Sequence, residues 1–407
     1  MKHRILPGLA VAVILAMVAT GCSRESGGGG GGGAKKTAKI GVIAPLTGPL
    51  SALGLGIKNS VDLAVKQANQ KGTLKDYTLV LDAQDDAATP ATGANAANKL
   101  ASDDTLAGVI GTLNSSVAQQ VAPVLAKASI AQISPANTNP TLTKGQDYIK
   151  SPKRVWPTYF RVCTTDAVQG PFAADYATKQ AGFKSVVTIH DKKTYGQGLV
   201  GEFTKQFTKD GGKVISAETI NAGDRDFGAV ASKVVSAKPD MVYYGGEYPE
   251  AGPLSAQLKD RGFKGPLFGG DGIFDDNFIK GGGGKKADGD LATSVGAPTE
   301  KLATAKQFVA DYKAAGYNEP FSAYGAFSYD AANILIQAMS KSLGSGTVKD
   351  DRSKIVDALG QTKDYNGVIG TTSFDQFGDT SNKVLTVYQV KSEKWADIFS
   401  GTFSGGS

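Results

Sequence analysis

A run of small polar residues, GTLNSS at positions 111–116, could bind an anion. It follows an apolar segment and precedes a stretch with helical periodicity, so it would form the start of a helix. Free backbone N–H groups and the helix dipole favour a negative group at that position. Ser115 is the stronger candidate for a carboxylate contact. Ser116 also fits a capping box with Gln119, which would give its hydroxyl a structural use instead.

Two further turns carry groups that could face a ligand. Residues 134–140 (SPANTNP) contain two prolines, which fix the backbone and leave carbonyl groups and the Thr138 hydroxyl exposed. Residues 269–272 (GGDG) place Asp271 among glycines, which permit close approach of a ligand. An unpaired carboxylate suits an ammonium group, although these residues alone are equally compatible with a solvated turn aspartate. The turns therefore predict sites for a carboxylate and for an ammonium group.

Catalytic chemistry has little support. His190 and His3 are the two histidines, and His3 lies in the signal-like segment described below. The chain has no nucleophile-elbow motif, zinc-type cysteine spacing, HExxH motif or phosphate loop. Asp271 and Glu247 could act as paired carboxylates of an exported hydrolase, but both tryptophans lie elsewhere in the chain, so none is placed to stack on a sugar. We therefore expect a binding protein without cofactor or metal.

Alternating apolar and amphipathic segments must position these turns. The rhythm predicts two successive α/β units, each a parallel sheet flanked by helices. Ligands of open α/β sheets bind beyond the carboxyl ends of the strands, where all three turns fall. The expected strands are 40–44, 78–81, 107–111, 130–134, 185–190, 213–216, 241–245 and 267–270. The expected helices are 57–71, 92–100, 116–128, 176–182, 198–211 and 323–343, the last assignable to either unit.

The amino terminus carries features of export. Residues 1–21 combine a basic start, an apolar run at 9–18 and small residues before Cys22, as in a secretory signal. The signal resembles that of bacterial lipoproteins, which implies acylation of Cys22 and a lipid-anchored, extracytoplasmic location at the cell membrane. The apolar run is short for a transmembrane anchor. Residues 22–37, with unbroken glycine at 27–33, predict a flexible tether.

Composition narrows the class further. The 407 residues are 41% hydrophobic and 20% charged, enough for two domains of ordinary size. The formal net charge is +6, and basic residues are scattered among acidic ones, which argues against nucleic-acid binding. If Cys22 is acylated, Cys163 has no partner for a disulfide. Its strand-like neighbours predict a buried, unreactive thiol.

Several segments together resemble one family. Residues 39–49 (KIGVIAPLTGP), 85–86 (DD), 190–198 (HDKKTYGQG) and 240–246 (DMVYYGG) resemble, in this order, the branched-chain amino acid binding proteins of ABC transporters. The resemblance extends from about residue 39 to about residue 390. It implies a type I periplasmic-binding-protein fold, with two Rossmann-like lobes joined by a three-segment hinge. The expected lobes are 38–160 plus 296–382 and 161–295 plus 383–407.

The resemblance also implies residue roles. Ser115 and Thr138 would hold the ligand α-carboxylate, helped by the backbone N–H of Ser116. The Ala136 carbonyl and the Thr138 hydroxyl would accept from the α-ammonium group. Tyr195 would cap the ligand from the second lobe, and Asp271 would face the ammonium group. The remaining predicted ligand-binding residues are Leu53, Asn137, Glu247 and Tyr324.

The chain departs from the family pattern at three places. Ala88 and Asn114 stand where many relatives carry a cysteine pair, and Leu53 stands where an aromatic residue is frequent. Glu247 also replaces an aromatic residue, with Tyr248 directly after it. Glu247 would either add a second negative charge, which would favour a cationic or polar ligand, or turn to solvent. Leucine, isoleucine or valine remains the leading expectation.

The resemblance implies a monomer that delivers an amino acid to an ABC permease and its ATPase. Closure of the hinge would trap the ligand between the lobes and create the shape that the permease recognises. A sensor of amino acids or amides that reports to a membrane signalling partner is the alternative, because the same lobes could serve either role.

Overall fold

The computed structural model of the protein describes residues 35–403. The predicted signal and Cys22 lie outside the described residues, as does most of the predicted tether. Strand β1 (Lys36–Ala44) begins inside that tether, because Lys36 and Thr37 pair with the neighbouring strand. The predicted tether end at residue 37 is therefore too late. Between residues 35 and 403, no helix combines the length and apolar character needed to cross a membrane.

The first sheet is parallel throughout and has the strand order β2–β1–β3–β4–β5. Successive side chains of a strand point to opposite faces, and both faces of β3 are buried, so this strand is a nearly continuous apolar run. At the edge of the sheet, residues 77–80 of β2 alternate between buried and exposed. In β1, Val42 packs in the larger core cluster while Ile43 packs in a second one. The strands of this sheet are β1 (Lys36–Ala44), β2 (Tyr77–Asp85), β3 (Leu106–Gly111), β4 (Ala131–Ser134) and β5 (Tyr159–Arg161).

The second sheet has the order β14–β13–β10–β9–β8–β6–β7, with the last two strands of the chain antiparallel at one edge. Its other neighbours pair in parallel. The strands are β6 (Ser185–His190), β7 (Lys213–Thr219), β8 (Met241–Gly245), β9 (Leu267–Gly269), β10 (Leu291–Ser294), β13 (Val384–Lys391) and β14 (Lys394–Thr402). A small hairpin, β11 (Tyr365–Gly367) with β12 (Gly370–Thr372), stands apart from both sheets.

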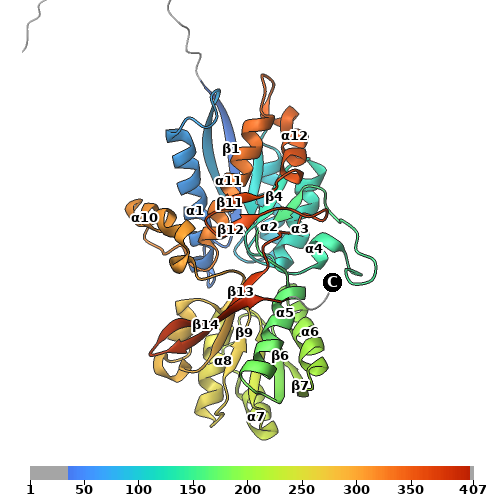
Figure 1. Cartoon of the computed structure of the whole chain (residues 1–407), viewed down its shortest axis with the longest axis vertical. Coiled ribbons are helices and arrows are strands. Elements are labelled where there is room, and N and C mark those ends of the chain that lie inside the picture. Colours follow the sequence, from blue (N-terminus) through green and yellow to red (C-terminus); the bar gives the residue numbers. More distant parts are fainter. Residues whose placement is uncertain (1–34, 404–407) are drawn as a thin grey trace, which may run out of the picture. The chain divides into compact units, whose positions relative to one another are not determined.

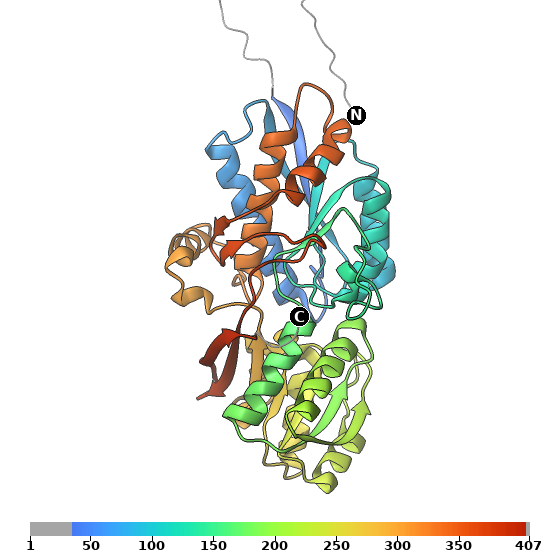
Figure 2. The same cartoon turned by 45° about the vertical axis from the view of Figure 1, so that its right-hand side comes forward.

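Helices cover both sheets, and we call each sheet with its helices a lobe (Figures 1 and 2). The α11 helix, predicted at 323–343, packs against α1 and β3 and so belongs to the first lobe. First-lobe helices are α1 (Ser51–Gln70), α2 (Pro90–Ala101), α3 (Ser115–Lys127), α4 (Thr141–Lys144), α10 (Lys306–Ala314), α11 (Gly325–Ser342) and α12 (Val348–Gly360). Second-lobe helices are α5 (Asp166–Asp175), α6 (Thr194–Lys209), α7 (Gly228–Ala237), α8 (Tyr248–Asp260) and α9 (Asp276–Gly281).

The chain passes between the lobes three times: after β5, after β10 and before β13. Arg161, which the sequence prediction placed in the second lobe, is the last residue of β5 and pairs with Ser134 in the first sheet. The two-unit α/β prediction is confirmed. Cys163 is buried as predicted, although it lies two residues beyond β5, and burial raises the pKa of its thiol.

Candidate ligand-binding site

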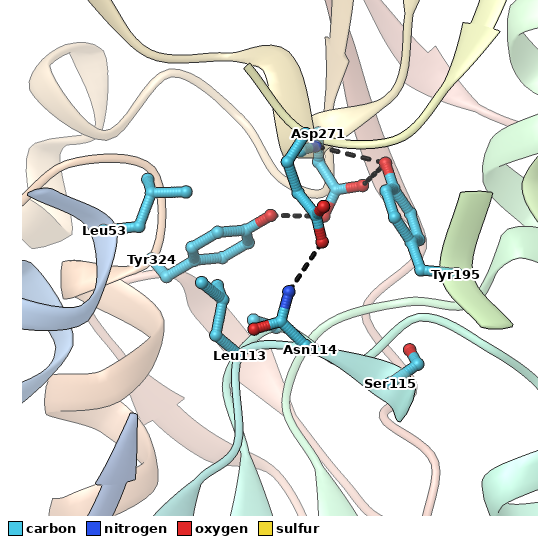
Figure 3. A pocket seen from close by; sticks show the side chains of 10 residues that line it. Leu53, Leu113, Asn114, Ser115, Tyr195, Asp271 and Tyr324 are labelled. Atoms are coloured by element: carbon cyan, nitrogen blue, oxygen red, sulfur yellow. Dashed lines mark hydrogen bonds between the residues drawn. The ribbon is translucent and has the colours of Figure 1, made fainter. Parts of the chain in front are cut away.

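A pocket lies where loops from the two lobes meet (Figure 3). The first lobe contributes residues from the start of α1, the loop into α3, the loop after β4 and the start of α11. The second lobe contributes the start of α6 and the loops after β8 and β9. The free volume is about 20 Å³, which is room for about one water molecule. The lining residues are Leu53, Leu113, Asn114, Ser115, Ala136, Tyr195, Glu247, Asp271, Gly272 and Tyr324.

Asp271 is the central polar group of the pocket. It follows β9 in a short turn and is only 1% exposed. Its Oδ1 accepts hydrogen bonds from the Gln169 amide (2.9 Å) and the Tyr195 hydroxyl (2.8 Å), and its Oδ2 accepts one from the Tyr324 hydroxyl (2.7 Å). Burial raises the pKa of Asp271, and these three donors offset only part of the effect. No lysine, arginine or histidine within residues 35–403 forms a salt bridge with it. The carboxylate thus has neutral donors and no counter-charge.

The packing of the residues that hold Asp271 explains why glycines stand on both sides of it. The side-chain oxygen of Gln169 in α5 accepts hydrogen bonds from the backbone N–H of Asp271 (2.9 Å) and from the Thr293 hydroxyl (2.6 Å). Gln169 therefore fixes the turn that follows β9. A Cβ on Gly270 would lie 2.3 Å from the Tyr195 hydroxyl oxygen, and one on Gly272 would lie 2.9 Å from the Tyr195 ring. We expected these glycines to admit a ligand directly. In the structure both glycines make room for Tyr195, and Gly272 also lines the pocket.

The turn that was predicted to bind an anion occurs at the predicted place, but its helix N-cap is a different residue. Helix α3 begins at Ser115, and Asn114 is its N-cap residue in extended conformation. The predicted capping box of Ser116 is therefore wrong, because Ser116 lies within the first turn. Its proposed partner Gln119 instead accepts a hydrogen bond from the Thr194 hydroxyl of the second lobe (3.0 Å). Ser115 is buried and lines the pocket, whereas Ser116 does not.

The loop after β4 contributes less than expected. Ala136 lines the pocket, whereas Asn137 and Thr138 are fully buried and do not. The Asn137 amide donates to the Leu113 carbonyl (2.8 Å), and its carbonyl oxygen accepts from the Tyr159 hydroxyl (3.0 Å). The Asn137 side chain therefore ties two loops of the first lobe together, and its polar groups are already occupied.

Glu247 does not turn to solvent. It is 5% exposed, and its carboxylate accepts hydrogen bonds from Asn114 Nδ2 (2.6 Å) and Lys193 Nζ (2.9 Å). Asn114, Leu113 and Gly272 line the pocket but were not predicted as ligand-binding residues. Each lies within two residues of a predicted residue, so the strand-end turns were the available signal. The contact between Lys193 and Glu247 forms only in the folded chain, and no sequence motif predicts it.

Further contacts join the lobes beside the pocket. The Asn139 amide donates to the Thr194 carbonyl (2.9 Å), and the Tyr248 hydroxyl donates to the Pro49 carbonyl. These bonds connect the loop after β4 with α6, and the loop after β1 with α8. The described arrangement therefore brings the two lobes into direct polar contact around a small space.

Comparison with known proteins agrees with this architecture. Residues 37–394 match the family described as periplasmic binding protein. A Leu/Ile/Val-binding protein homolog of Brucella melitensis is 34% identical over 359 residues, covering 88% of this chain and 91% of the relative. The crystal structure of the leucine-binding protein LivK from Thermotoga maritima superposes with a TM-score of 0.79 at 30% identity, over 89% of this chain and 98% of that one.

A second solved structure gives the same result. The branched-chain amino acid transporter substrate-binding protein LivJ from Streptococcus pneumoniae, in complex with isoleucine, has a TM-score of 0.80 at 27% identity and covers 90% of this chain and 99% of that one. The predicted resemblance and the predicted type I fold are both confirmed. By the extent of the match and the arrangement of its two sheets, the chain belongs to the periplasmic binding protein family, among the Leu/Ile/Val-binding relatives of ABC transporters.

Proposed function

We propose that this protein is the lipid-anchored, extracytoplasmic substrate-binding protein of an ABC importer and binds a branched-chain amino acid between its lobes. It acts as a monomer, holds the ligand by hinge closure, delivers it to a permease and ATPase, and catalyses no reaction. The lobes comprise residues 38–160 plus 296–382 and residues 161–295 plus 383–407, with Arg161 moved to the first. Acylated Cys22 and the glycine-rich tether hold this body near the membrane.

The observation that carries the proposal is the uncompensated carboxylate of Asp271. An amino acid brings an ammonium group, which would supply the missing counter-charge. Charge-assisted hydrogen bonds of this kind are stronger than neutral ones, and a buried position strengthens them further. Tyr195 and Tyr324 already orient both carboxylate oxygens, so the site is organised before the ligand arrives.

The other lining residues fit the rest of an aliphatic amino acid. Ser115 at the start of α3 supports binding of the α-carboxylate, because helix N-termini attract anions. The Ala136 carbonyl is proposed as a further partner of the ligand backbone. The Thr138 hydroxyl is proposed with it, because this buried group lacks a hydrogen-bond partner within residues 35–403, although it lies outside the present pocket lining. Leu53 and Leu113 provide an apolar wall for a leucine, isoleucine or valine side chain. The LivJ relative is named for transport, which favours an importer over the sensory alternative.

The size of the pocket and the contacts around it support the proposal that the two lobes close around the ligand. A space of about 20 Å³ admits an amino acid only when the lining groups separate. Separation of the lobes would break the Asn139–Thr194 and Tyr248–Pro49 contacts, and closure would restore them. A ligand that touches both Ser115 and Asp271 binds the closed form better, and it shifts the population by that difference in affinity.

A thermal-shift screen with the common amino acids tests the proposal. The protein lacking its signal segment is first unfolded and refolded to release any retained ligand. Leucine, isoleucine or valine is expected to raise the melting temperature, because a ligand at a hundredfold excess over its Kd adds about 2.7 kcal/mol of stability. Calorimetric titration then gives the affinity. If the refolded protein shows no shift with any amino acid, the proposed function is wrong.

Gly198→Ala is expected to weaken amino-acid binding about tenfold. Gly198 of α6 faces the first lobe, and a Cβ there would lie 2.5 Å from Asn139 Nδ2, closer than real Cβ contacts allow. The clash acts only when the lobes are together, so it penalises closure. A penalty of about 1.4 kcal/mol corresponds to a tenfold change in Kd. Calorimetric titration with leucine measures it.

Gly201→Ala on the same helix is the matched control. A Cβ on Gly201 has no atom within 4 Å, so this variant gains helix propensity of about 1 kcal/mol without touching the first lobe. It should melt at a higher temperature and bind leucine as the unaltered protein does. Equal affinity of the two variants would show that α6 does not approach Asn139 in the bound form.

A further inference from the structure

Glu247 is the most unusual group of the pocket, because it adds a second buried carboxylate to a site that already contains Asp271. Its Oε1 accepts from Asn114 Nδ2 across the lobe boundary, and its Oε2 accepts from Lys193 Nζ within the second lobe. Glu247 lines the pocket, whereas Lys193 lies behind it at the entrance to α6. The Glu247 carboxylate is thus held by the Asn114 amide of the first lobe and by the Lys193 ammonium group of the second lobe.

The positive charge of Lys193 offsets the negative charge of Glu247. Burial alone would lower the pKa of Lys193, but the adjacent Glu247 carboxylate outweighs it and raises that pKa, so the lysine is cationic. Burial and then the charge of Glu247 raise the pKa of Asp191, which favours the neutral form of its carboxyl group. Glu250 accepts the backbone N–H of Gly223 (2.7 Å) and does not line the pocket, and burial raises its pKa. Lys193 therefore offsets Glu247, and of the two carboxylates that line the pocket only Asp271 has no cationic partner in the described part of the chain.

We infer that Asn114, Lys193 and Glu247 form a charge-balanced clasp that makes the pocket select amino acids with neutral side chains. The inference rests on the proposed function and specifies its substrate class. A neutral amino acid satisfies a pocket with one uncompensated carboxylate through its single ammonium group. A lysine or ornithine side chain would bring a second cation near Glu247, whose charge Lys193 already neutralises. The clasp also links the lobes through the Asn114–Glu247 bond.

Charge variants test the clasp through a ratio of affinities. The affinities for leucine and for ornithine are measured by calorimetric titration with the unaltered protein, Lys193→Met, Glu247→Gln and the double variant. Lys193→Met leaves two uncompensated carboxylates and should shift the leucine-to-ornithine ratio about tenfold toward ornithine. Glu247→Gln keeps an acceptor for Asn114, leaves Lys193 unpaired and should shift the ratio the other way. The double variant should return to the original ratio.

The control is Lys192→Met, which removes an adjacent cation that bonds Asn221 (2.8 Å) rather than Glu247. Its ratio should match that of the unaltered protein. A ratio within about threefold of the original in both single variants overturns the inference, whatever their stability, because the ratio compares two ligands on the same folded protein. If the unaltered protein binds no amino acid, the proposed function itself fails. If it binds leucine while the ratios stay constant, only the clasp is wrong.

Discussion

Asp271→Asn is expected to weaken binding of leucine about 100-fold without loss of the fold. The change removes the negative charge that would face the ligand ammonium group and retains the size and most hydrogen bonds of the side chain. Truncating one partner of a buried charge pair typically costs about 2–5 kcal/mol of binding free energy, and 100-fold is about 2.7 kcal/mol. Because burial makes the free carboxylate unfavourable, the ligand-free variant should melt no lower than the unaltered protein.

Asp330→Asn provides the matched control for Asp271→Asn. Asp330 is also a fully buried aspartate, but it lies in α11 and accepts the backbone N–H groups of Val368 and Ile369 (2.9 Å each). Its replacement should lower stability and leave the affinity for leucine unchanged. Calorimetric titration and thermal melting of both variants separate the two effects. Leucine affinity within a few-fold of the original in Asp271→Asn would remove Asp271 from the ligand site.

The pH dependence of binding follows from the same carboxylate. The ligand ammonium group favours ionised Asp271, whose pKa in the free protein is raised by burial. The affinity should therefore fall as the pH drops through that raised pKa. In the ligand-free protein the sign is opposite: the contribution of Asp271 to stability is present at low pH and is lost as pH rises through its raised pKa. Asp271→Asn should abolish both trends.

Strand-end turns were the part of the site that the sequence could predict. Apolar runs and helical periodicity located the strands, and parallel topology placed the turns containing Ser115, Ala136 and Asp271 at one edge of each sheet. The structure brings these residues into one pocket with Leu53 and Tyr324. Local pattern is sufficient here because each residue lies within two positions of a strand end or begins a helix, where the backbone determines its position.

Side-chain partners across the fold could not be predicted in the same way. Asn137 is used to bind Leu113 and Tyr159, and Glu247 is neutralised by Lys193, 54 residues earlier. Such pairings depend on tertiary distances and competing hydrogen bonds, which short motifs do not encode.

Arg161 is the clearest case of a residue whose role appears only in the folded chain. It is fully buried, and its guanidinium donates to Asp379 Oδ1 (2.7 Å), the carbonyl groups of Asn137 (2.6 Å) and Asn139 (3.0 Å), and the Thr143 hydroxyl (2.6 Å). It therefore holds the loop that carries Ala136. Its bond to Asp379 also joins two of the passages between the lobes. Arg161 ends β5, just before the first passage, and Asp379 lies in the segment that leads to β13 and contains the last passage.

Arg161→Met is expected to lower the free energy of unfolding by about 3 kcal/mol. Breaking a buried ion pair from one side costs about 3–5 kcal/mol, because the partner charge stays buried. Burial would raise the pKa of Asp379, but Arg161 and then Lys144 (3.4 Å from Oδ2) lower it, so Lys144 compensates part of the loss and the lower figure applies. Urea denaturation at neutral pH measures the change.

Two further variants distinguish loss of the Arg161–Asp379 salt bridge from loss of side-chain packing. Arg161→Met with Asp379→Asn removes both charges, so it should be less destabilised than the sum of the single changes. Arg154→Met changes a half-buried arginine that donates to backbone carbonyl groups and should cost less. Additive single changes, or an Arg161→Met cost below about 1 kcal/mol, would contradict the pairing. With the pairing intact, the salt bridge joins the loop that carries Ala136 to two of the three passages between the lobes. We therefore expect this loop to keep its shape during the proposed hinge closure.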